Sequence, residues 1–553
     1  MNTYQMVIAL LAGLGIFLYG MKVMSDALQK SAGGRMKKLL EVLTNNKYLG
    51  VVVGTVITGI IQSSSATTVM VVGLVNAGIM NLTQAVGVIM GANIGTTATA
   101  QLIALFKFKQ MIPYTIIIGI LLTMIPKKKS LRHFGEFLLG FGILFMGMEM
   151  MGDSMKPLKE MPWFQDLMVA LSNNPFLGVL VGVGLTVLVQ SSSATIGILQ
   201  ALALQGLIPL SAALPILFGD NIGTCVTAIL ASIGASVTAK RAALIHLTFN
   251  IIGTVIFLIL LKPLFWFVQW LPGDVVNQIA NAHTTFNVVN TLIQINFSML
   301  LIKFVTKVIP GEDKHEQFEL KYLDKRILET PTVAAAQIVK EIVRMGELAR
   351  ENVARGVNAM ITKDEKSIAD LYENEKIINE LEKQISEYLV AVSNTAISED
   401  QRYKITGMFN TIHDVERIGD HAENLVEIAE YSIENRVSFS STAIEELKQI
   451  HKNVDLAIEN ALEALKTENV AYINNVDLYE MKVDELREKF KETHIARLNK
   501  NECNINAGVI FLDALTNLER VSDHCVNIVD VVRPGGRLYE QKDSKHEIAA
   551  MKS

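Results

Sequence analysis

Two short segments of the chain combine an amide side chain with a row of hydroxyls and share the letters QSSSAT. The first begins at Gln62 and the second at Gln190, so the copies lie 128 residues apart. Amide and hydroxyl groups donate hydrogen bonds to an anion without carrying a charge, and their oxygens are ligands for hard cations. No Lys or Arg lies in the apolar stretches around either segment. The pattern predicts a site where neutral donors hold a small anion and a sodium ion offsets its charge.

A second polar motif, NIGT, follows each QSSSAT segment at the same offset, at Asn93–Thr96 and again at Asn221–Thr224. Ordered matches at one constant offset indicate an internal duplication. The two copies differ just before this motif, because Asp220 stands where the first copy has Ala92. A carboxylate inside a membrane is a functional candidate by default. It could bind a cation or carry a proton, and the plainer alternative is a helix cap or a partner for nearby backbone groups.

The motifs lie in stretches that require a membrane. Residues 48–106 contain no charged side chain, and residues 167–239 contain one. A single span needs about 20 apolar residues, so each stretch crosses or re-enters the bilayer more than once. The first apolar segment, residues 5–28, lacks a basic leader and is too long for a cleaved signal peptide, so we expect it to remain as the first helix. Cysteine spacing indicates free thiols and no structural disulfide at Cys225, Cys503 and Cys525.

The helices that must position the motifs follow from segment lengths and charge. The arm from Leu49 to Ile61 is too short to span, so residues 49–79 and 177–207 are expected to be re-entrant hairpins with Ser-rich tips. Three full crossings then remain in the first repeat, and an odd number inverts the second. The linker 22–47 has six basic and two acidic residues, whereas its counterpart 149–175 has two basic and four acidic. This asymmetry places the two linkers on opposite sides, the first in the cytoplasm.

This first part of the chain resembles the type II sodium/phosphate cotransporter family in its paired QSSSAT segments, its NIGT elements and the stretch His283-Thr-Thr-Phe-Asn287. The resemblance covers about residues 5–310 and implies that the QSSS hairpins form the phosphate and sodium site. The candidate residues are Gln62, Ser63, Ser64, Ser65, Thr67, Gln190, Ser191, Ser192, Ser193, Thr195, Asn93, Thr96, Asn221, Thr224 and Asp220. The His-x-x-Phe-Asn pattern also occurs at His246–Asn250, where one helix face carries His and Asn. Helix packing and hydrogen bonding are the expected role of both copies.

The chain changes character after Pro310. Up to that residue it has 19 Lys and Arg against 9 Asp and Glu, and beyond it 31 against 46. Long amphipathic helices rich in Glu and Lys are expected at 331–361, 364–392, 399–432, 441–466, 469–499 and 502–533, as two three-helix bundles. The motif E-R-x-x-D-H-x-x-N begins at Glu416 and, 103 residues later, at Glu519. Carboxylates four residues apart share one helix face and repel each other, which a bound cation would relieve. A solvated acidic face is the alternative.

This repeated motif resembles PhoU, a family of phosphate-signalling proteins whose E-x-x-x-D helices bind metal clusters. The resemblance covers about residues 318–535. It nominates as metal ligands Glu416, Asp420, Glu519 and Asp523, with weaker candidates on the preceding helices at Glu375, Glu480 and Asp484. Carboxylate oxygens are hard ligands, so iron, manganese or magnesium is expected in preference to zinc.

The sequence therefore predicts an all-α protein. A membrane transport domain, residues 1–310, would consist of two inverted repeats (about 5–126 and 131–310), followed by a linker 311–330, a cytoplasmic PhoU-like domain 331–535 and a tail 536–553. We expect a sodium-coupled symporter for inorganic phosphate in the inner membrane, working by alternating access. It would not be an enzyme, and the lack of a Walker A pattern argues against ATP as the driver.

The expected partners are inorganic phosphate, sodium and the lipid bilayer. A nucleic-acid partner is not expected, and a homo-oligomer is compatible with the sequence. Two rival interpretations remain open. One is an exporter, or a carrier of another small oxyanion, and the other is a membrane receptor that senses phosphate without transporting it. The stoichiometry of sodium to phosphate and the direction of flux also stay open at this point.

Overall fold

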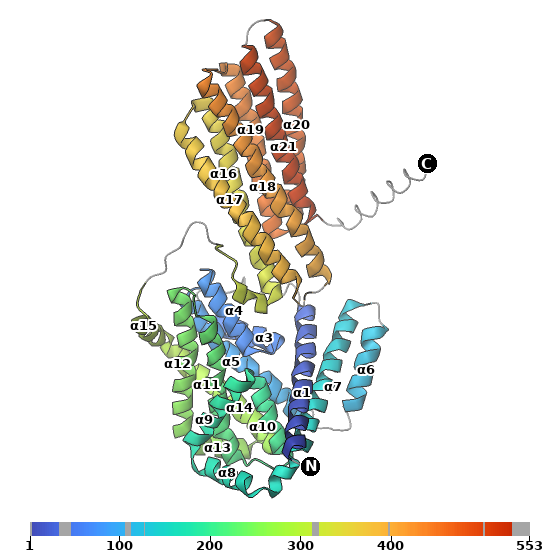
Figure 1. Cartoon of the computed structure of the whole chain (residues 1–553), viewed down its shortest axis with the longest axis vertical. Helices are drawn as coiled ribbons and strands as arrows, with labels where there is room; N and C mark the ends of the chain where they lie inside the picture. Colours follow the sequence, from blue (N-terminus) through green and yellow to red (C-terminus); the bar gives the residue numbers. More distant parts are fainter. Residues whose placement is uncertain are drawn as a thin grey trace. The chain divides into compact units, whose positions relative to one another are not determined.

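The computed structural model describes residues 3–32, 46–105, 112–125, 128–311, 320–395, 397, 399–500 and 504–533, and every regular element in these ranges is a helix (Figure 1). The expected all-α class is thus confirmed. Cys503 and the expected tail lie outside the described residues. The chain separates into two compact units. A membrane unit comprises Met1–Lys314 and Asp324–Val333, and a helical unit comprises His315–Leu323 and Ala334–Ser553.

Six helices of the membrane unit, within the described residues, are long and apolar enough to cross a bilayer. They are α1 (Thr3–Ala32), α5 (Leu82–Leu105), α7 (Lys129–Met155) continued by η2 (Lys156–Glu160), α11 (Leu210–Ala231), α12 (Val237–Ile259), and α14 (Val275–Gln294) continued by η3 (Ile295–Phe297) and α15 (Ser298–Val308). Shorter helices are α3 (Lys47–Ile61), α4 (Ser64–Asn76), α6 (Ile112–Met124), α8 (Pro162–Asn173), α9 (Pro175–Val189), α10 (Ser192–Leu204) and α13 (Leu261–Trp270). Helices α8 and α9 are bent by 114° and would make a seventh span if taken as one. The described part of α6 has only 13 residues, so the third crossing expected in the first repeat is not among the six.

The first helices of the two repeats pack against each other through glycines. Gly20 of α1 faces Gly140 and Leu144 of α7, and Gly13 faces Gly147 and Met151. A Cβ at Gly20 would lie 2.3 Å from the Leu144 nitrogen, so only glycine permits this close approach. Residue numbers that rise along α1 fall along α7, which means that the two helices are antiparallel. Opposite directions of matching helices are what an inverted repeat requires.

Each QSSS segment joins a short helix to a returning one. Gly50 of α3 faces Gly87 of α5, and Gly95 of α5 faces Thr58 of α3, so these two helices run in the same direction. The chain must therefore come back between them, and α4 is the returning arm. A 15-residue helix such as α3 is about 22 Å long, shorter than the bilayer core of about 30 Å. Gly178 and Gly182 of α9 make the equivalent contacts with α11.

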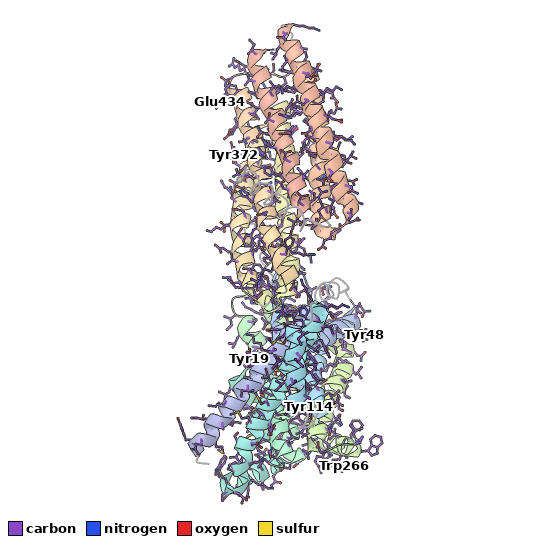
Figure 2. All side chains as sticks on the ribbon, turned by 90° about the vertical axis from the view of Figure 1, so that its right-hand side faces the viewer. Tyr19, Tyr48, Tyr114, Trp266, Tyr372 and Glu434 are labelled. Carbon is purple, nitrogen blue, oxygen red and sulfur yellow. The ribbon has the colours of Figure 1, made fainter. Side chains whose placement is uncertain are left out.

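Aromatic side chains mark the outer surface of the membrane unit. Tyr19, Tyr48, Tyr114 and Trp266 are all more than half exposed (Figure 2). In a soluble protein this would be unfavourable, whereas lipid tails and the interface accept such residues.

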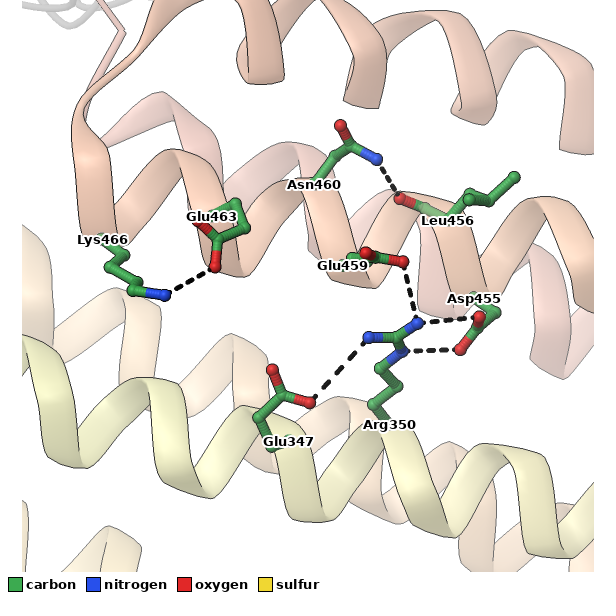
Figure 3. A network of polar contacts seen from close by, with 8 residues as sticks. All are labelled: Glu347, Arg350, Asp455, Leu456, Glu459, Asn460, Glu463 and Lys466. Carbon is green, nitrogen blue, oxygen red and sulfur yellow. Dashed lines mark hydrogen bonds and ion pairs between the residues drawn. The ribbon is translucent and has the colours of Figure 1, made fainter.

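The helical unit consists of α16 (Pro331–Thr362), α17 (Glu365–Ser393), α18 (Glu399–Glu434), α19 (Ser441–Thr467), α20 (Val470–Asn499) and α21 (Ile505–Asp530). All six begin and end within three residues of the predicted positions. A polar network joins α16 to α19, the first helices of the two expected bundles (Figure 3). Arg350 donates from Nε and Nη2 to both carboxylate oxygens of Asp455, at 2.6 and 2.9 Å, and from Nη2 to Glu459 at 2.9 Å. Such bidentate contacts set the register of two helices.

Candidate functional site

The two QSSS tips have the same local geometry. Gln62 has a φ of 57° and Gln190 a φ of 58°, so both adopt the left-handed conformation that ends α3 and α9. The next residue in each copy caps the returning helix, since the Oγ of Ser63 accepts from the Ala66 nitrogen at 3.1 Å and the Oγ of Ser191 from the Ala194 nitrogen at 3.3 Å. A left-handed conformation costs a non-glycine residue about 1 to 2 kcal/mol. Its presence at both tips, in residues other than glycine, makes the two glutamines candidates for a functional role.

Helices α4 and α10 therefore begin at the tips. Their first N–H groups and the positive ends of their dipoles point towards the tip region, which is the usual arrangement for holding an anion. Ser64, Ser192 and Ser193 are buried beside these helix starts. Donors of this kind suit a phosphate group, and none of them is a permanent cation.

A pair of threonine hydroxyls bridges the two arms of each hairpin. Thr58 lies 2.9 Å from Thr67, and Thr186 lies 3.0 Å from Thr195. The sequence interpretation missed Thr58 and Thr186, although they lie 128 residues apart and the repeat offset could have found them.

Asp220 makes the second threonine pair different from the first. Thr186 donates to the Oδ1 of Asp220 at 2.7 Å, while the other carboxylate oxygen has no partner and the residue is fully buried. Thr186 has a single hydroxyl proton. That proton faces both Asp220 and Thr195, and the Thr195 hydroxyl donates in turn to the Ser191 carbonyl at 3.3 Å. One free carboxylate oxygen beside two hydroxyl oxygens is a suitable environment for a small cation. In the first repeat the equivalent position is the buried Ala92.

The surroundings of the two tips differ. Gln62 is 4% exposed, and its Oε1 accepts from the Thr99 hydroxyl at 2.8 Å. The Oγ of Ser25 in α1 also donates to the Ile61 carbonyl at 2.5 Å, directly before the tip. Gln190 is exposed, and its amide donates to the Val187 carbonyl at 2.6 Å. No hydrogen bond joins residues 62–67 to residues 190–195, all of which are described. The first tip is thus held in the interior and the second is accessible.

The two NIGT motifs make different hydrogen bonds. The Nδ2 of Asn93 donates to the Oδ1 of Asn250 at 2.6 Å, and its Oδ1 lies 3.2 Å from the Nε2 of His246. This fully buried network links α5 of the first repeat to α12 of the second. In the second motif Asn221 and Thr224 bond to backbone carbonyls of their own helix, and Thr96 does the same in the first.

The two His-x-x-Phe-Asn copies also differ. His246 and Asn250 take part in the hydrogen-bonded network, in line with the role expected from sequence. His283 and Asn287 are equally buried, but both ring nitrogens of His283 and the Oδ1 of Asn287 have no partner. Unpaired polar atoms in a membrane interior are costly. Water or a solute is therefore expected next to this second copy.

Carboxylates gather in the helical unit between α17 and α18. Glu375, Asp420 and Glu423 each offer an oxygen, and these oxygens lie within 4.8 Å of one another. Burial, followed by repulsion from Glu423 and Asp420, raises the pKa of Glu375 to about 7. One buried oxygen of Glu375 has no hydrogen-bond partner, and the Oε2 of Glu416 has none either but lies 3.6 Å from the Nδ1 of His413 and 3.9 Å from the Nε of Arg417. Buried carboxylates that repel each other and retain free oxygens fit a divalent or trivalent cation.

The structure brings together a different set of acids from the one nominated by the motif. Asp420 is in the close group, and Glu375, a weaker candidate, joins it. Glu423 was missed, and its counterpart in the second motif is Val526. Glu416 lies nearby on α18, where burial and then repulsion from Asp420 raise its pKa.

The second acidic set lies on α20 and α21 and is looser. Burial, and repulsion between its members, raise the pKa values of Glu480, Glu519 and Asp523. An arginine supplies part of the neutralising charge in both sets, since Arg487 lies 3.5 Å from Glu519 and the Nη1 of Arg417 donates to the Oδ2 of Asp420 at 3.1 Å. Among the described residues only the first set forms a close group of three.

The two E-R-x-x-D-H motifs meet where α18 faces α21. The Nδ1 of His421 lies 2.9 Å from the Oδ1 of Asn517, and the Nδ1 of His524 lies 2.9 Å from the Oδ1 of Asp414. Position 517 is 103 residues after position 414, the same offset that relates the two histidines. The ring centres are 5.6 Å apart, so the duplicated bundles pack through equivalent residues.

Comparison with known proteins agrees with this two-part organisation. A family model described as Na+/Pi-cotransporter matches residues 16–153 and 146–290, and a PhoU domain model matches residues 342–429 and 447–532. The chain is 24% identical over 519 residues to the Salmonella typhimurium protein named "Putative inorganic phosphate export protein YjbB", covering 93% of this chain and 95% of that one.

Other relatives match one part each. The uncharacterized protein YqeW of Bacillus subtilis is 31% identical over 296 residues, covering 54% of this chain and 96% of that one. Sodium-dependent phosphate transport protein 2A of Mus musculus is 34% identical over 100 residues, covering 18% of this chain and 16% of that one. Among solved structures, PhoU from Pseudomonas aeruginosa is 24% identical, covers 35% of this chain and 93% of that chain, and has a TM-score of 0.34.

Proposed function

Since this chain belongs to the Na+/Pi-cotransporter family and carries PhoU domains after the transport part, we propose that it moves inorganic phosphate together with sodium across the inner membrane by alternating access. The observation that carries the proposal is the duplicated tip. Two helices of the membrane unit start at left-handed glutamines, one buried and one exposed, and their surroundings offer neutral donors to an anion.

Phosphate binding is assigned to the two tips. The N-termini of α4 and α10, with the side chains of Gln62, Gln190 and the neighbouring serines, supply hydrogen bonds that neutral donors can also give up. Release matters for a carrier, because a site that holds its substrate too tightly slows the cycle. A permanent cation such as Arg would bind phosphate more strongly, and the apolar stretches contain none.

Sodium binding is assigned to Asp220 with Thr186 and Thr195. The free oxygen of the buried carboxylate is the only charged ligand that the described residues of the two hairpins and the NIGT helices offer. A cation there would cancel a charge that is otherwise costly in a low-dielectric region. The mouse relative is named as sodium-dependent, which supports sodium as the coupling ion.

The name of the Salmonella relative favours a second candidate. YjbB is described as an export protein, and a carrier that works by alternating access can run in either direction when the gradients reverse. Export of phosphate is therefore kept as the alternative to uptake. The geometry of the tips is compatible with both uptake and export.

Residues of the helical unit would hold a metal ion and regulate the carrier. Glu375, Asp420 and Glu423 would bind it, with Glu416 close by, and the ion would neutralise their mutual repulsion. Hard oxygen ligands favour iron, manganese or magnesium. The charge asymmetry between the linkers of the two repeats supports a cytoplasmic position for this unit.

Reconstitution tests the proposal. Purified protein in liposomes is supplied with labelled phosphate, and uptake is measured with an inward sodium gradient and with an equal potassium gradient. We expect uptake only with sodium, and efflux from preloaded vesicles when the sodium gradient is reversed. Equal rates in both salts would refute sodium coupling. Absence of any flux would instead favour a phosphate receptor.

A further inference from the structure

The segment that leads into the helical unit is itself part of the membrane unit. Residues 324–330, here called the clamp segment, contain η4 (Lys325–Glu329) and pack against α4, the returning arm of the first hairpin. Ile327 is fully buried. A Cβ at Gly73 of α4 would lie 3.0 Å from the Cγ1 of Ile327. The glycine therefore leaves the space into which the isoleucine fits.

Charged groups of the clamp segment attach to a helix end of the second repeat. Nη1 of Arg326 pairs with the Oδ2 of Asp324 at 2.6 Å, and the side chains are 20% and 8% exposed. Nε of Arg326 donates to the carbonyl of Ala231 at 2.5 Å, where α11 ends. A guanidinium at this place satisfies a free carbonyl and complements the negative end of the helix dipole.

Asn76, the last residue of α4, completes the cluster. Its Nδ2 donates to the Oδ2 of Asp324 at 2.6 Å, and its Oδ1 accepts from the Ser236 nitrogen at 2.7 Å. Ser236 is the N-cap of α12. The clamp segment thus joins the return arm of the first hairpin to the end of α11 and the start of α12. Two repeats that move relative to each other must disturb a cluster that spans both.

The clamp segment is also continuous with the helical unit. Thr330 is fully buried, and the next residue, Pro331, begins the 32-residue helix α16. Only one residue separates η4 from this helix, so a displacement of α16 has almost no intervening chain to absorb it. By contrast, the last membrane helix ends at Val308, and the chain needs residues 309–323 to reach the clamp segment.

We propose that the clamp segment is the coupling element of this carrier. Asn76, Asp324 and Arg326 are positioning residues that hold the first hairpin against the second repeat, and the state of the helical unit reaches the transport site through them. The proposal rests on the proposed function, because it needs a carrier whose rate can be measured and a helical unit that regulates it.

A double-mutant cycle in the full-length protein tests the coupling. Asp420→Asn perturbs the carboxylate group of the helical unit, and Arg326→Gln breaks the clamp segment. Lys325→Gln is the matched control, since it removes the same charge from the same segment at an exposed position with no contact in the cluster. Each variant is reconstituted, and the maximal rate and half-saturating phosphate concentration of sodium-driven uptake are measured. Thermal unfolding checks that each variant is folded.

We expect Asp420→Asn to change the maximal rate in the wild-type and Lys325→Gln backgrounds by the same factor. In the Arg326→Gln background the response should be lost, so that the ratio of rates returns to one. Asn76→Ala, which breaks the cluster from α4 without changing a charge, should abolish the response as well and serves if Arg326→Gln does not fold. An undiminished response to Asp420→Asn in the Arg326→Gln or the Asn76→Ala background would overturn the proposal. So would an unchanged maximal rate when Asp420→Asn is introduced into the wild-type carrier. A wild type without any uptake would contradict the proposed function itself.

Discussion

Replacing Asp220 by Asn tests whether the buried carboxylate binds the coupling ion. The amide is nearly isosteric and can still accept the 2.7 Å hydrogen bond from Thr186, so the hairpin should keep its shape. What is lost is one negative charge and the oxygen that has no protein partner. A purely structural carboxylate would tolerate this change, whereas a cation ligand would not.

The size of the effect follows from the interaction removed. Contacts of charged groups contribute about 1.5 to 3 kcal/mol each, and 1.4 kcal/mol corresponds to a factor of ten. The sodium concentration for half-maximal uptake should therefore rise about 10- to 150-fold. Phosphate affinity measured at saturating sodium should change far less, because no tip residue is altered.

The assay is phosphate uptake into liposomes over a range of sodium concentrations, with potassium keeping the ionic strength constant. Asp153→Asn is the matched control, because Asp153 lies at the end of α7, pairs with Lys156 at 2.7 Å and is about half exposed. An unchanged sodium requirement in Asp220→Asn would refute the assignment. Loss of the pH dependence of uptake, with the sodium requirement intact, would refute it in favour of proton transfer.

Three further outcomes are expected. Gln62→Ala should lower the free energy of unfolding by about 1 to 3 kcal/mol, because the Thr99 hydroxyl loses its buried acceptor. Gln190→Ala at the exposed tip should leave the melting temperature unchanged and reduce uptake. Equal melting curves of the two variants would contradict the different burial of the two tips. Cysteines placed at positions 31 and 172 in a cysteine-replaced background should react with an impermeant reagent from opposite sides, and labelling of both from one side would exclude inversion. Manganese affinity of the full-length protein should fall by about tenfold per pH unit below about 7, since Glu375 with its raised pKa must lose one proton to bind the ion. Glu375→Gln should remove this pH dependence. An affinity that stays constant between pH 8 and pH 5.5 would argue against the site.

Much of the organisation was predictable because the sequence contains repeated motifs and periodically spaced apolar residues. A constant offset of 128 residues related the two transport motifs, and an offset of 103 related the two acidic motifs. Amphipathic spacing placed all six helices of the second half within a few residues, since long helices separated by polar turns leave little ambiguity. Uncharged stretches longer than one span required a membrane whatever the detailed fold.

The detailed environment of each repeat was decided by tertiary contacts. Identical QSSSAT letters produce a buried Gln62 and an exposed Gln190, because Ser25 of α1 and Thr99 hydrogen-bond to the first tip, whereas the Gln190 amide bonds to the nearby Val187 carbonyl. The two His-x-x-Phe-Asn copies are alike in sequence, yet only His246 meets Asn93. A repeat specifies local conformation twice, but it does not specify what packs against each copy.

Partners that are distant in sequence were likewise invisible before folding. Glu375 joins Asp420 and Glu423 only because α17 packs against α18, and the motif alone favoured Glu416. Asp324 and Arg326 lie in the expected linker 311–330, for which no contact was predicted. The structure places them on the ends of α4 and α11. The free carbonyl at the end of α11 and the space left by the glycine of α4 exist only once the membrane helices have assembled, so the sequence alone could not predict these contacts.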